Sequence, residues 1–188
     1  MEEKKILITY AVAQEMVNFE WPNAEFYYLR TGIGKMKSTY YLTNVVQNYK
    51  PDLVINIGTA GSVEHQVGDV FCCTQFVDRD LYKARDLGLG YRVDMSLPLM
   101  QKGIAQNWPN EGVCNTGDSF VTDVESLEGD VVDMEAFVQA WVCEKHDIPF
   151  VSIKCVTDII GENSVKHWEE KLVEAKAHLT AYIKSIKL

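Results

Sequence analysis

Apolar residues between positions 129 and 163 change from the spacing of a helix to that of a strand. The residues at helical spacing are Met134, Phe137, Val138, Trp141 and Val142. Downstream, positions 149–156 form the run PFVSIKCV, which is largely apolar and β-branched, as buried strands are. The pattern therefore predicts a helix of about a dozen residues followed by a strand.

The rest of the chain also predicts alternating strands and helices. Apolar runs predict strands at residues 5–10, 25–30, 53–57, 70–77, 91–93 and 113–116. Helical patterns predict helices at 35–49, 98–108 and 164–186, the last with an apolar stripe opposite many charges, and residues 11–19 predict a turn into a short helix. This alternation is typical of a layered α/β fold. Because no repeat, low-complexity run or linker interrupts it, we expect a single domain over residues 1–188.

Two acidic residues flank the helix and strand described first. Glu135 stands at the predicted helix start, and Asp158 follows the predicted strand. The helix covers roughly 18 Å and the strand about 25 Å, so the chain returns to the sheet end that it left. Both carboxylates are then expected at the carboxyl ends of the strands, where α/β sheets bind ligands. A helix-dipole partner and a turn cap would show the same spacing, so both interpretations stay open.

Three other segments follow predicted strands on the same side. Glu15 comes shortly after residues 5–10, although a glutamate on a solvated helix surface would look the same. The run GIGK at residues 32–35 is not a phosphate loop, because Met36 follows the lysine, and a two-glycine turn before a helix is expected. Residues 58–62, GTAGS, predict a small-residue loop that can contact a ligand through backbone and hydroxyl groups, although any tight turn would look the same.

Charge and composition narrow the class of partner. A net charge of −9 argues against nucleic acid or an anionic membrane as the main partner, and it favours a small molecule or a protein. The N-terminal apolar run is too short for a signal peptide or a membrane span, so a cytoplasmic protein is expected. The five cysteines have no CxxC spacing and the four histidines are scattered. Buried thiols are therefore expected, without disulfides or a metal site.

Five motifs, in this order, resemble a known family: GTAGS, VGDV, NTGDSF, VVDMEAF and VSIKCVTD. The chain resembles the purine nucleoside phosphorylase/nucleosidase superfamily and, within it, the 5′-methylthioadenosine/S-adenosylhomocysteine nucleosidases. The run Asp-Met-Glu-Ala, followed at the family's usual distance by Thr-Asp, is its most specific feature. The resemblance implies a three-layer α/β/α fold with a central twisted mixed sheet. It also implies a homodimer that cleaves the bond between ribose and a purine without a cofactor.

The resemblance assigns roles around the purine and the attacking water. Asp158 would protonate the leaving base at N7, with Thr157 beside it. Glu15 would orient and deprotonate the water. Phe120 would stack on the purine, while the backbone of Val121 pairs with the purine edge. An aspartic acid that stays protonated near neutral pH needs a raised pKa, which burial after an apolar strand can provide.

Roles around the sugar follow from the same resemblance. Glu135 would bind the ribose 2′- and 3′-hydroxyls, and Met134 would lie against the sugar. Thr59 and Gly61 would line the sugar side. Asp133 stands where the family has a glutamate. Because the departing base leaves an oxocarbenium-like sugar, negative charge near the ribose would stabilise the transition state.

Water is the expected nucleophile. Phosphorylases of the superfamily bind phosphate with arginines after the first strand and before the small-residue loop, but these stretches read TYAVAQE and VINIGTAGS here. A phosphate dianion needs charge-assisted donors. Lys154 replaces the family's arginine ahead of the catalytic aspartate, and residues are missing between 80 and 112. A futalosine-type hydrolase, a phosphate-dependent phosphorylase and a silent nucleoside-binding protein stay as alternatives.

Overall fold

The computed structural model describes residues 3–103, 111–121, 127–161 and 165–186, with the side chains of all of these except 165–169. The strands are β1 (Lys4–Tyr10), β2 (Ala24–Arg30), β3 (Leu53–Ser62), β4 (Val70–Asp78), β5 (Arg92–Asp94), β6 (Glu111–Thr116), β7 (Val131–Asp133) and β8 (Phe150–Ile159). The α-helices are α1 (Lys35–Tyr49), α2 (Arg79–Tyr82), α3 (Ser96–Gln101), α4 (Ala136–Lys145) and α5 (Val165–Ser185). Two 3-10 helices are η1 (Ala13–Glu15) and η2 (Arg85–Leu87).

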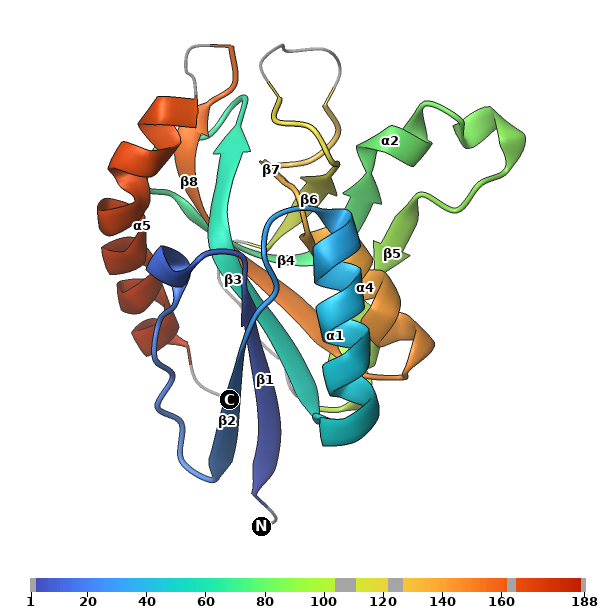
Figure 1. Ribbon diagram of the computed structural model, residues 1–188, viewed down its shortest axis with the longest axis vertical. Coiled ribbons are helices and arrows are strands. Elements are labelled where there is room, and N and C mark those ends of the chain that lie inside the picture. The colour runs from blue at the N-terminus through green and yellow to red at the C-terminus, as the bar shows by residue number, and fades with distance from the viewer. Residues whose placement is uncertain (1–2, 104–110, 122–126, 162–164, 187–188) are drawn as a thin grey trace.

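The sheet closes on itself. β1 pairs in parallel with β2 and β3, and β3 pairs in parallel with β8. β8 runs antiparallel to β4, which runs parallel to β6, and β6 runs parallel to β7. One bridge between Gly61 of β3 and Val132 of β7 completes a ring of β3, β8, β4, β6 and β7. The carboxyl ends of β3, β6, β7 and β8 thereby lie near one another (Figure 1).

Helices cover the sheet on two sides, which gives three layers (Figure 1). α5 packs on β8, β3 and β4, whereas α4 packs on β6, β8, β4 and β5 and carries α1 against it. The buried core between them draws on every strand of the ring, for example through Ile55, Phe76, Cys114, Val131 and Phe150. The predicted α/β fold with a mixed sheet flanked by helices is confirmed.

Two strands continue past their predicted ends. β3 runs through Ser62, so the segment GTAGS is a strand rather than a loop, and every residue of β3 is buried. β8 runs through Ile159, so Asp158 lies within the strand rather than after it. Glycine and aspartate are poor strand formers on their own. They extend these strands because β3 and β8 pair with each other to their ends, across a bulge between Ala60 and Gly61.

Two predicted helices are shorter than expected. Residues 11–19 are predicted to form a turn into a short helix, and the helix is only the 3-10 turn η1. Its Glu15 carboxylate is bonded to β3 and back to the backbone of Ala11 and Val12, and these contacts override helix propensity. The helix predicted at 98–108 is α3, which ends at Gln101, and positions 104–108 lie outside the described residues. The short strand predicted at 91–93 is β5, one residue later.

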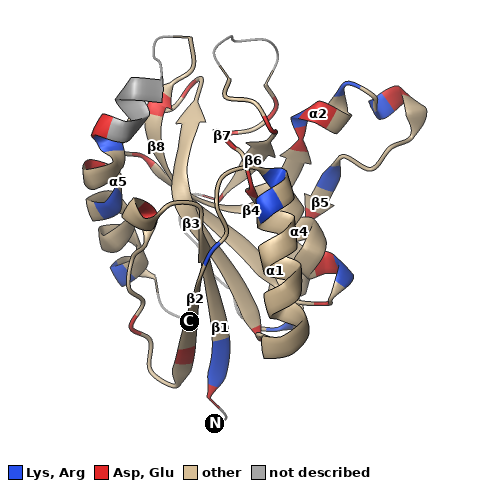
Figure 2. Ribbon diagram, viewed as in Figure 1, with Lys and Arg blue, Asp and Glu red and all other residues tan. Residues whose placement is uncertain are grey.

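Most charged residues lie outside the central strands, and acidic residues gather near the ends of β4, β6 and β7 (Figure 2). The longest helix, α5, alternates apolar and charged positions, so only one face of it is buried. Across the part of the chain that the structure describes, no helix is long and apolar enough to cross a membrane.

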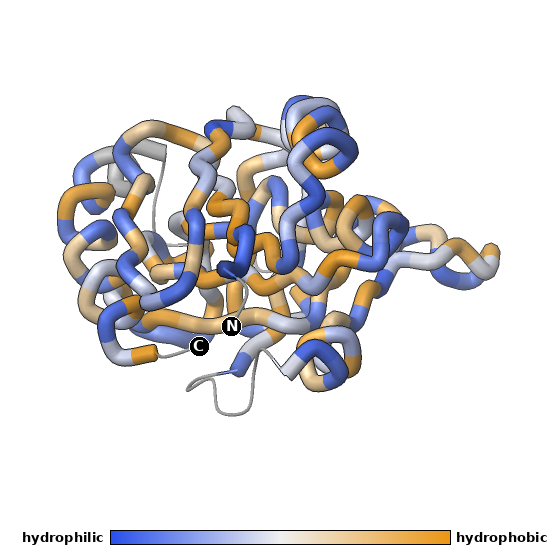
Figure 3. Tube along the Cα trace, turned by 90° about the horizontal axis from the view of Figure 1, so that it is seen from below, coloured by the Kyte–Doolittle hydropathy of each residue, from blue (hydrophilic) through white to orange (hydrophobic). Residues whose placement is uncertain are grey.

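The segment between β4 and β5 forms an arm that extends away from the body, with hydrophobic positions near its end (Figure 3). Leu87 and Leu89 on this arm are 79% and 46% exposed. The five cysteines, by contrast, are all buried and free, as expected.

Candidate active site

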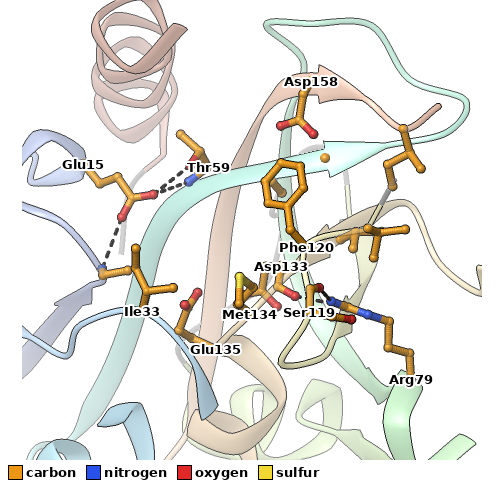
Figure 4. A pocket seen from close by; sticks show the side chains of 16 residues that line it. Glu15, Ile33, Thr59, Arg79, Ser119, Phe120, Asp133, Met134, Glu135 and Asp158 are labelled. Atoms are coloured by element: carbon orange, nitrogen blue, oxygen red, sulfur yellow. Dashed lines mark hydrogen bonds between the residues drawn. The ribbon is translucent and has the colours of Figure 1, made fainter. Parts of the chain in front are cut away.

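A cavity of about 230 Å³ opens where the strands of the ring end (Figure 4). The predicted site residues come together here with one exception, Thr157. Those that line the cavity are Glu15, Thr59, Gly61, Phe120, Val121, Asp133, Met134, Glu135 and Asp158. Glu135 and Asp158 therefore lie at the same end of the sheet, as the sequence predicts.

Glu15 is held rigidly on one side of the cavity. One carboxylate oxygen, Oε1, accepts hydrogen bonds from the backbone N–H of Thr59 at 2.9 Å and from its hydroxyl at 2.8 Å. The other, Oε2, accepts the N–H groups of Ala11 at 3.2 Å and Val12 at 3.1 Å. A β-carbon at Gly58 would lie 3.1 Å from Oε1, so a glycine at this position leaves room for the carboxylate. The four hydrogen bonds hold the Glu15 carboxyl group in one orientation at the cavity wall.

Glu135 occupies the N-cap position of α4 and is only 7% exposed. Its Oε1 accepts the backbone N–H of Gly34 at 2.9 Å. Gly34 has φ +94°, a left-handed conformation that favours glycine, so the two-glycine turn brings this N–H to the carboxylate. Burial, with the negative charge of Asp133, raises the pKa of Glu135 to about 8, against the opposing effects of Lys154 and the Gly34 N–H.

Beneath Glu135 lies a buried ion pair between Asp133 and Lys154. Oδ2 of Asp133 lies 2.8 Å from Nζ of Lys154 and also accepts the N–H of Ala136 at 2.9 Å. Oδ1 of Asp133 accepts the hydroxyl of Thr116 at 2.5 Å. Burial acts to raise the pKa of Asp133, but the charge and hydrogen bond of Lys154 outweigh it and lower the pKa. The two partners act on Glu135 in opposite directions: the charge of Asp133 raises its pKa and that of Lys154 lowers it.

Asp158 stands on the other side of the cavity and is 5% exposed. Its Oδ1 accepts the hydroxyl of Thr157 at 2.9 Å. Burial raises the pKa of Asp158, although this hydrogen bond acts in the opposite direction. Thr157 does not line the cavity; its hydroxyl lies behind Asp158, also 3.4 Å from the carbonyl of Ala60. Thr157 therefore contacts the carboxylate rather than the cavity.

Phe120 and Met134 supply the apolar part of the cavity. Phe120 follows β6 and is 36% exposed, and its ring points into the cavity below Asp158 (Figure 4). Met134 lies between the two acidic residues Asp133 and Glu135. An aromatic face beside two carboxylate walls suits a flat, uncharged ring attached to a polar group.

Other lining residues were not found from the sequence. They are Ala11, Ile33, Ala60, Arg79, Ser119, Val132 and Ile160. Ile33 lies in the two-glycine turn, which the sequence predicts before a helix but does not connect to the cavity. Arg79 directly follows β4. Its position between two aspartates is the one feature of the sequence that could have indicated a role at the cavity. Among the described residues, no group of three or more His, Cys, Asp or Glu side chains could hold a metal ion.

Comparison with known proteins gives the same architecture. The family model for the phosphorylase superfamily matches residues 10–186. A 5′-methylthioadenosine/S-adenosylhomocysteine nucleosidase of Bacillus cereus is 30% identical, covering 82% of this chain and 77% of the relative. The chain belongs to the phosphorylase superfamily.

Solved structures share its fold. The 5′-methylthioadenosine/S-adenosylhomocysteine nucleosidase of Neisseria meningitidis, in complex with methylthio-immucillin-A, superimposes with a TM-score of 0.79 at 24% identity and covers 97% of this chain and 100% of that one. The futalosine hydrolase of Helicobacter pylori superimposes with a TM-score of 0.78 at 22% identity, covering 97% of each chain.

Proposed function

We propose that the protein hydrolyses the N-glycosidic bond of a purine nucleoside, with 5′-methylthioadenosine and S-adenosylhomocysteine as the first candidate substrates. The named relative at 30% identity supports this reaction class. One structural observation carries the proposal: carboxylates on opposite sides of a single cavity have unlike environments. Asp158 is buried, accepts one hydrogen bond and has a raised pKa, whereas Glu15 accepts four hydrogen bonds.

These environments suit an acid and a base. A protonated Asp158 gives its proton to N7 of the purine, which makes the base a better leaving group. Glu15 takes a proton from the attacking water on the other side of the sugar. Glu135 and Met134 hold the ribose, and the negative charge of the site stabilises the oxocarbenium-like transition state. Phe120 stacks on the base, which places N7 toward Asp158.

Water is favoured over phosphate as the nucleophile because a phosphate dianion requires positively charged donors. Of the described residues that line the cavity, Arg79 is the one cation. Its guanidinium donates to the backbone carbonyls of Asn115 at 3.2 Å, Asp133 at 3.0 Å and Gly117 at 3.1 Å, and to that of Ser119. These bonds direct Arg79 toward the protein backbone.

A panel of purine nucleosides, assayed with and without phosphate for release of free base, tests the proposal. It includes 5′-methylthioadenosine, S-adenosylhomocysteine, adenosine, inosine and futalosine. We expect free base and a free sugar, at a rate that phosphate does not change. A sugar 1-phosphate product would instead establish a phosphorylase, and tight nucleoside binding without base release would establish a silent binding protein. Preference for futalosine would change the substrate but keep the reaction.

We also propose a homodimer, which the exposed leucines of the arm support. Light scattering coupled to gel filtration measures the molar mass directly. Leu87→Glu with Leu89→Glu places charges on this surface, so it is expected to shift the mass from that of a dimer toward that of a monomer. A wild-type mass equal to that of one chain would contradict the proposal.

A further inference from the structure

The chain leaves β4 through the sequence Asp78-Arg79-Asp80, and the three side chains contact neighbouring segments in different directions. Arg79 turns toward the segment after β6: its guanidinium donates to the backbone carbonyls of Asn115, Gly117 and Ser119. It also reaches the carbonyl of Asp133, at the end of β7. One planar cation therefore joins the ends of β4, β6 and β7.

The fit between Arg79 and the segment after β6 is close. A β-carbon added at Gly117 would lie 2.6 Å from both Cζ and Nε of Arg79, closer than packed atoms come. Gly117 therefore allows the guanidinium to lie against the backbone. Because Ser119, Phe120 and Val121 follow directly and line the cavity, the position of Arg79 sets where the cavity's aromatic wall begins.

The two aspartates turn the other way, toward Lys35 at the start of α1. Nζ of Lys35 lies 3.1 Å from Oδ2 of Asp78 and 2.6 Å from Oδ2 of Asp80. The backbone N–H of Lys35 donates to Oδ1 of Asp118 at 2.8 Å, and the N–H of Asp118 donates to Oδ2 of Asp80 at 3.1 Å. Asp78 is buried, so part of this network is shielded from solvent and from screening by salt. The start of α1 and the segment after β6 are thereby tied to each other and to β4.

Both tied segments carry groups of the candidate site. Lys35 directly follows Gly34, whose N–H contacts Glu135, and the segment held by Arg79 continues into Phe120. We propose that Arg79 and Lys35 are positioning residues that set the separation between the sugar-binding wall and the base-stacking wall. This inference rests on the proposed function, because the two walls are assigned to sugar and base there. Both residues act through the segments they hold: Arg79 through the backbone carbonyls that it contacts, and Lys35 through Gly34.

Removing the two side chains should have distinguishable effects. Arg79→Gln frees the segment that begins the base-stacking wall, so substrate and transition state lose the same stacking contact. We expect KM to rise at least about tenfold while kcat changes less than about threefold. The inhibition constant of free adenine should rise in parallel. Lys35→Met loosens the sugar side as well, so kcat should fall in addition to the rise in KM.

Conservative changes and neighbouring cations provide the controls. Arg85→Gln and Lys83→Met remove exposed cations from the same arm and should leave both constants unchanged. Lys35→Arg keeps the charge and should recover most of the loss, which a merely structural defect would not predict. Lys35→Met combined with Asp80→Asn should be less damaging than the sum of the two changes, since they break one contact.

Wild-type turnover is measured first, and every variant is assayed well below its unfolding midpoint. A wild type that releases no base contradicts the proposed function. If the wild type is active but Arg79→Gln has an unchanged KM, this inference alone is overturned. The same holds if Arg85→Gln raises KM as much as Arg79→Gln does. If Arg79→Gln does not fold, Lys35→Met and Lys35→Arg decide it: an unchanged kcat/KM in the first, or no recovery in the second, overturns it.

Discussion

Oδ2 of Asp158 lies 2.8 Å from the point where a β-carbon at Gly61 would stand. Gly61 sits at the bulge where the pairing of β3 and β8 shifts by one residue, and it also bridges β3 to β7. The absence of a side chain there lets the Asp158 carboxylate lie directly against the neighbouring strand. The closure of the sheet and the placement of the candidate acid thus depend on the same glycine.

Gly61→Ala should displace that carboxylate. The added methyl group would also meet the side chain of Ile160 at 3.3 Å, so the strain cannot be relieved on that side. We expect kcat to fall at least about tenfold and the free energy of unfolding to fall by about 1–3 kcal/mol. Gly90→Ala is the matched control, because a β-carbon there meets nothing within 4 Å. Equal activity of the two variants would contradict the role given to Gly61.

Asp158→Asn tests the proton donor directly. Asparagine keeps an oxygen that can accept the Thr157 hydroxyl, so the fold should be unchanged, but it cannot protonate the purine. We expect kcat to fall by about 10²–10⁴-fold. In the wild type, kcat should decrease as the pH rises through the raised pKa of Asp158, and this decrease should be absent from the variant's residual rate. Asp147→Asn, an exposed change, should behave as wild type.

Glu15→Gln should lower both turnover and stability. An amide has one accepting oxygen. The Glu15 carboxylate accepts hydrogen bonds on both oxygens, from the backbone N–H and hydroxyl of Thr59 and from the N–H groups of Ala11 and Val12. Two donors must therefore face an NH₂ group, which costs about 1–3 kcal/mol of unfolding free energy. The loss of the base should reduce kcat by at least about 100-fold. Thr59→Val keeps the carboxylate and removes only one donor, so kcat should fall less than in Glu15→Gln. An equal fall in both variants would contradict the role of Glu15 as the base.

The strands and helices whose interiors are apolar could be predicted from the sequence, because their periodicity is local. β1, α1 and β4 were placed within one or two residues of their bounds. The far ends of β3 and β8 could not, since GTAGS and TDI become strand only by pairing with each other across a sequence separation of nearly one hundred residues. The closure of the ring through Gly61 and Val132 likewise leaves no local signal.

The carboxylates of the candidate site were easier to place than its cations. Glu15, Glu135 and Asp158 each follow or flank a recognisable strand, so chain geometry alone directs them to one edge. Lys154 was recognised as a charge-conserving replacement, but its partner Asp133 was not identified as such, because their contact joins β8 to β7 through the interior. Arg79 contacts backbone carbonyls from two other strand ends, and no spacing in the sequence records that.

Lys154→Met should destabilise the protein strongly. The change leaves Asp133 buried without its cation, and breaking a buried pair from one side costs about 3–5 kcal/mol. Replacing both partners, as Lys154→Met with Asp133→Asn, removes the unpaired charge and should restore part of that loss. Chemical denaturation of the wild type, Lys154→Met, Asp133→Asn and the double variant measures the coupling free energy between the two residues. A double variant that is less stable than Lys154→Met alone would show that the pair does not act as a charge-compensating unit.

Glu135→Gln should change stability in a pH-dependent way. Because the folded-state pKa of Glu135 is raised to about 8, folding favours its protonated form; this contribution is fully present below the unfolded-state pKa and is lost as the pH rises through about 8. Glutamine is neutral at every pH and avoids that loss. The variant should therefore be more stable than the wild type by an amount that grows by about 1.4 kcal/mol per pH unit between about pH 5 and 8.

Unfolding midpoints measured across that pH interval check this slope. The control Glu144→Gln, an exposed change on α4, should show no such pH dependence. A stability difference between Glu135→Gln and the wild type that is constant with pH would mean that Glu135 is ionised in the folded protein, with Lys154 compensating its burial.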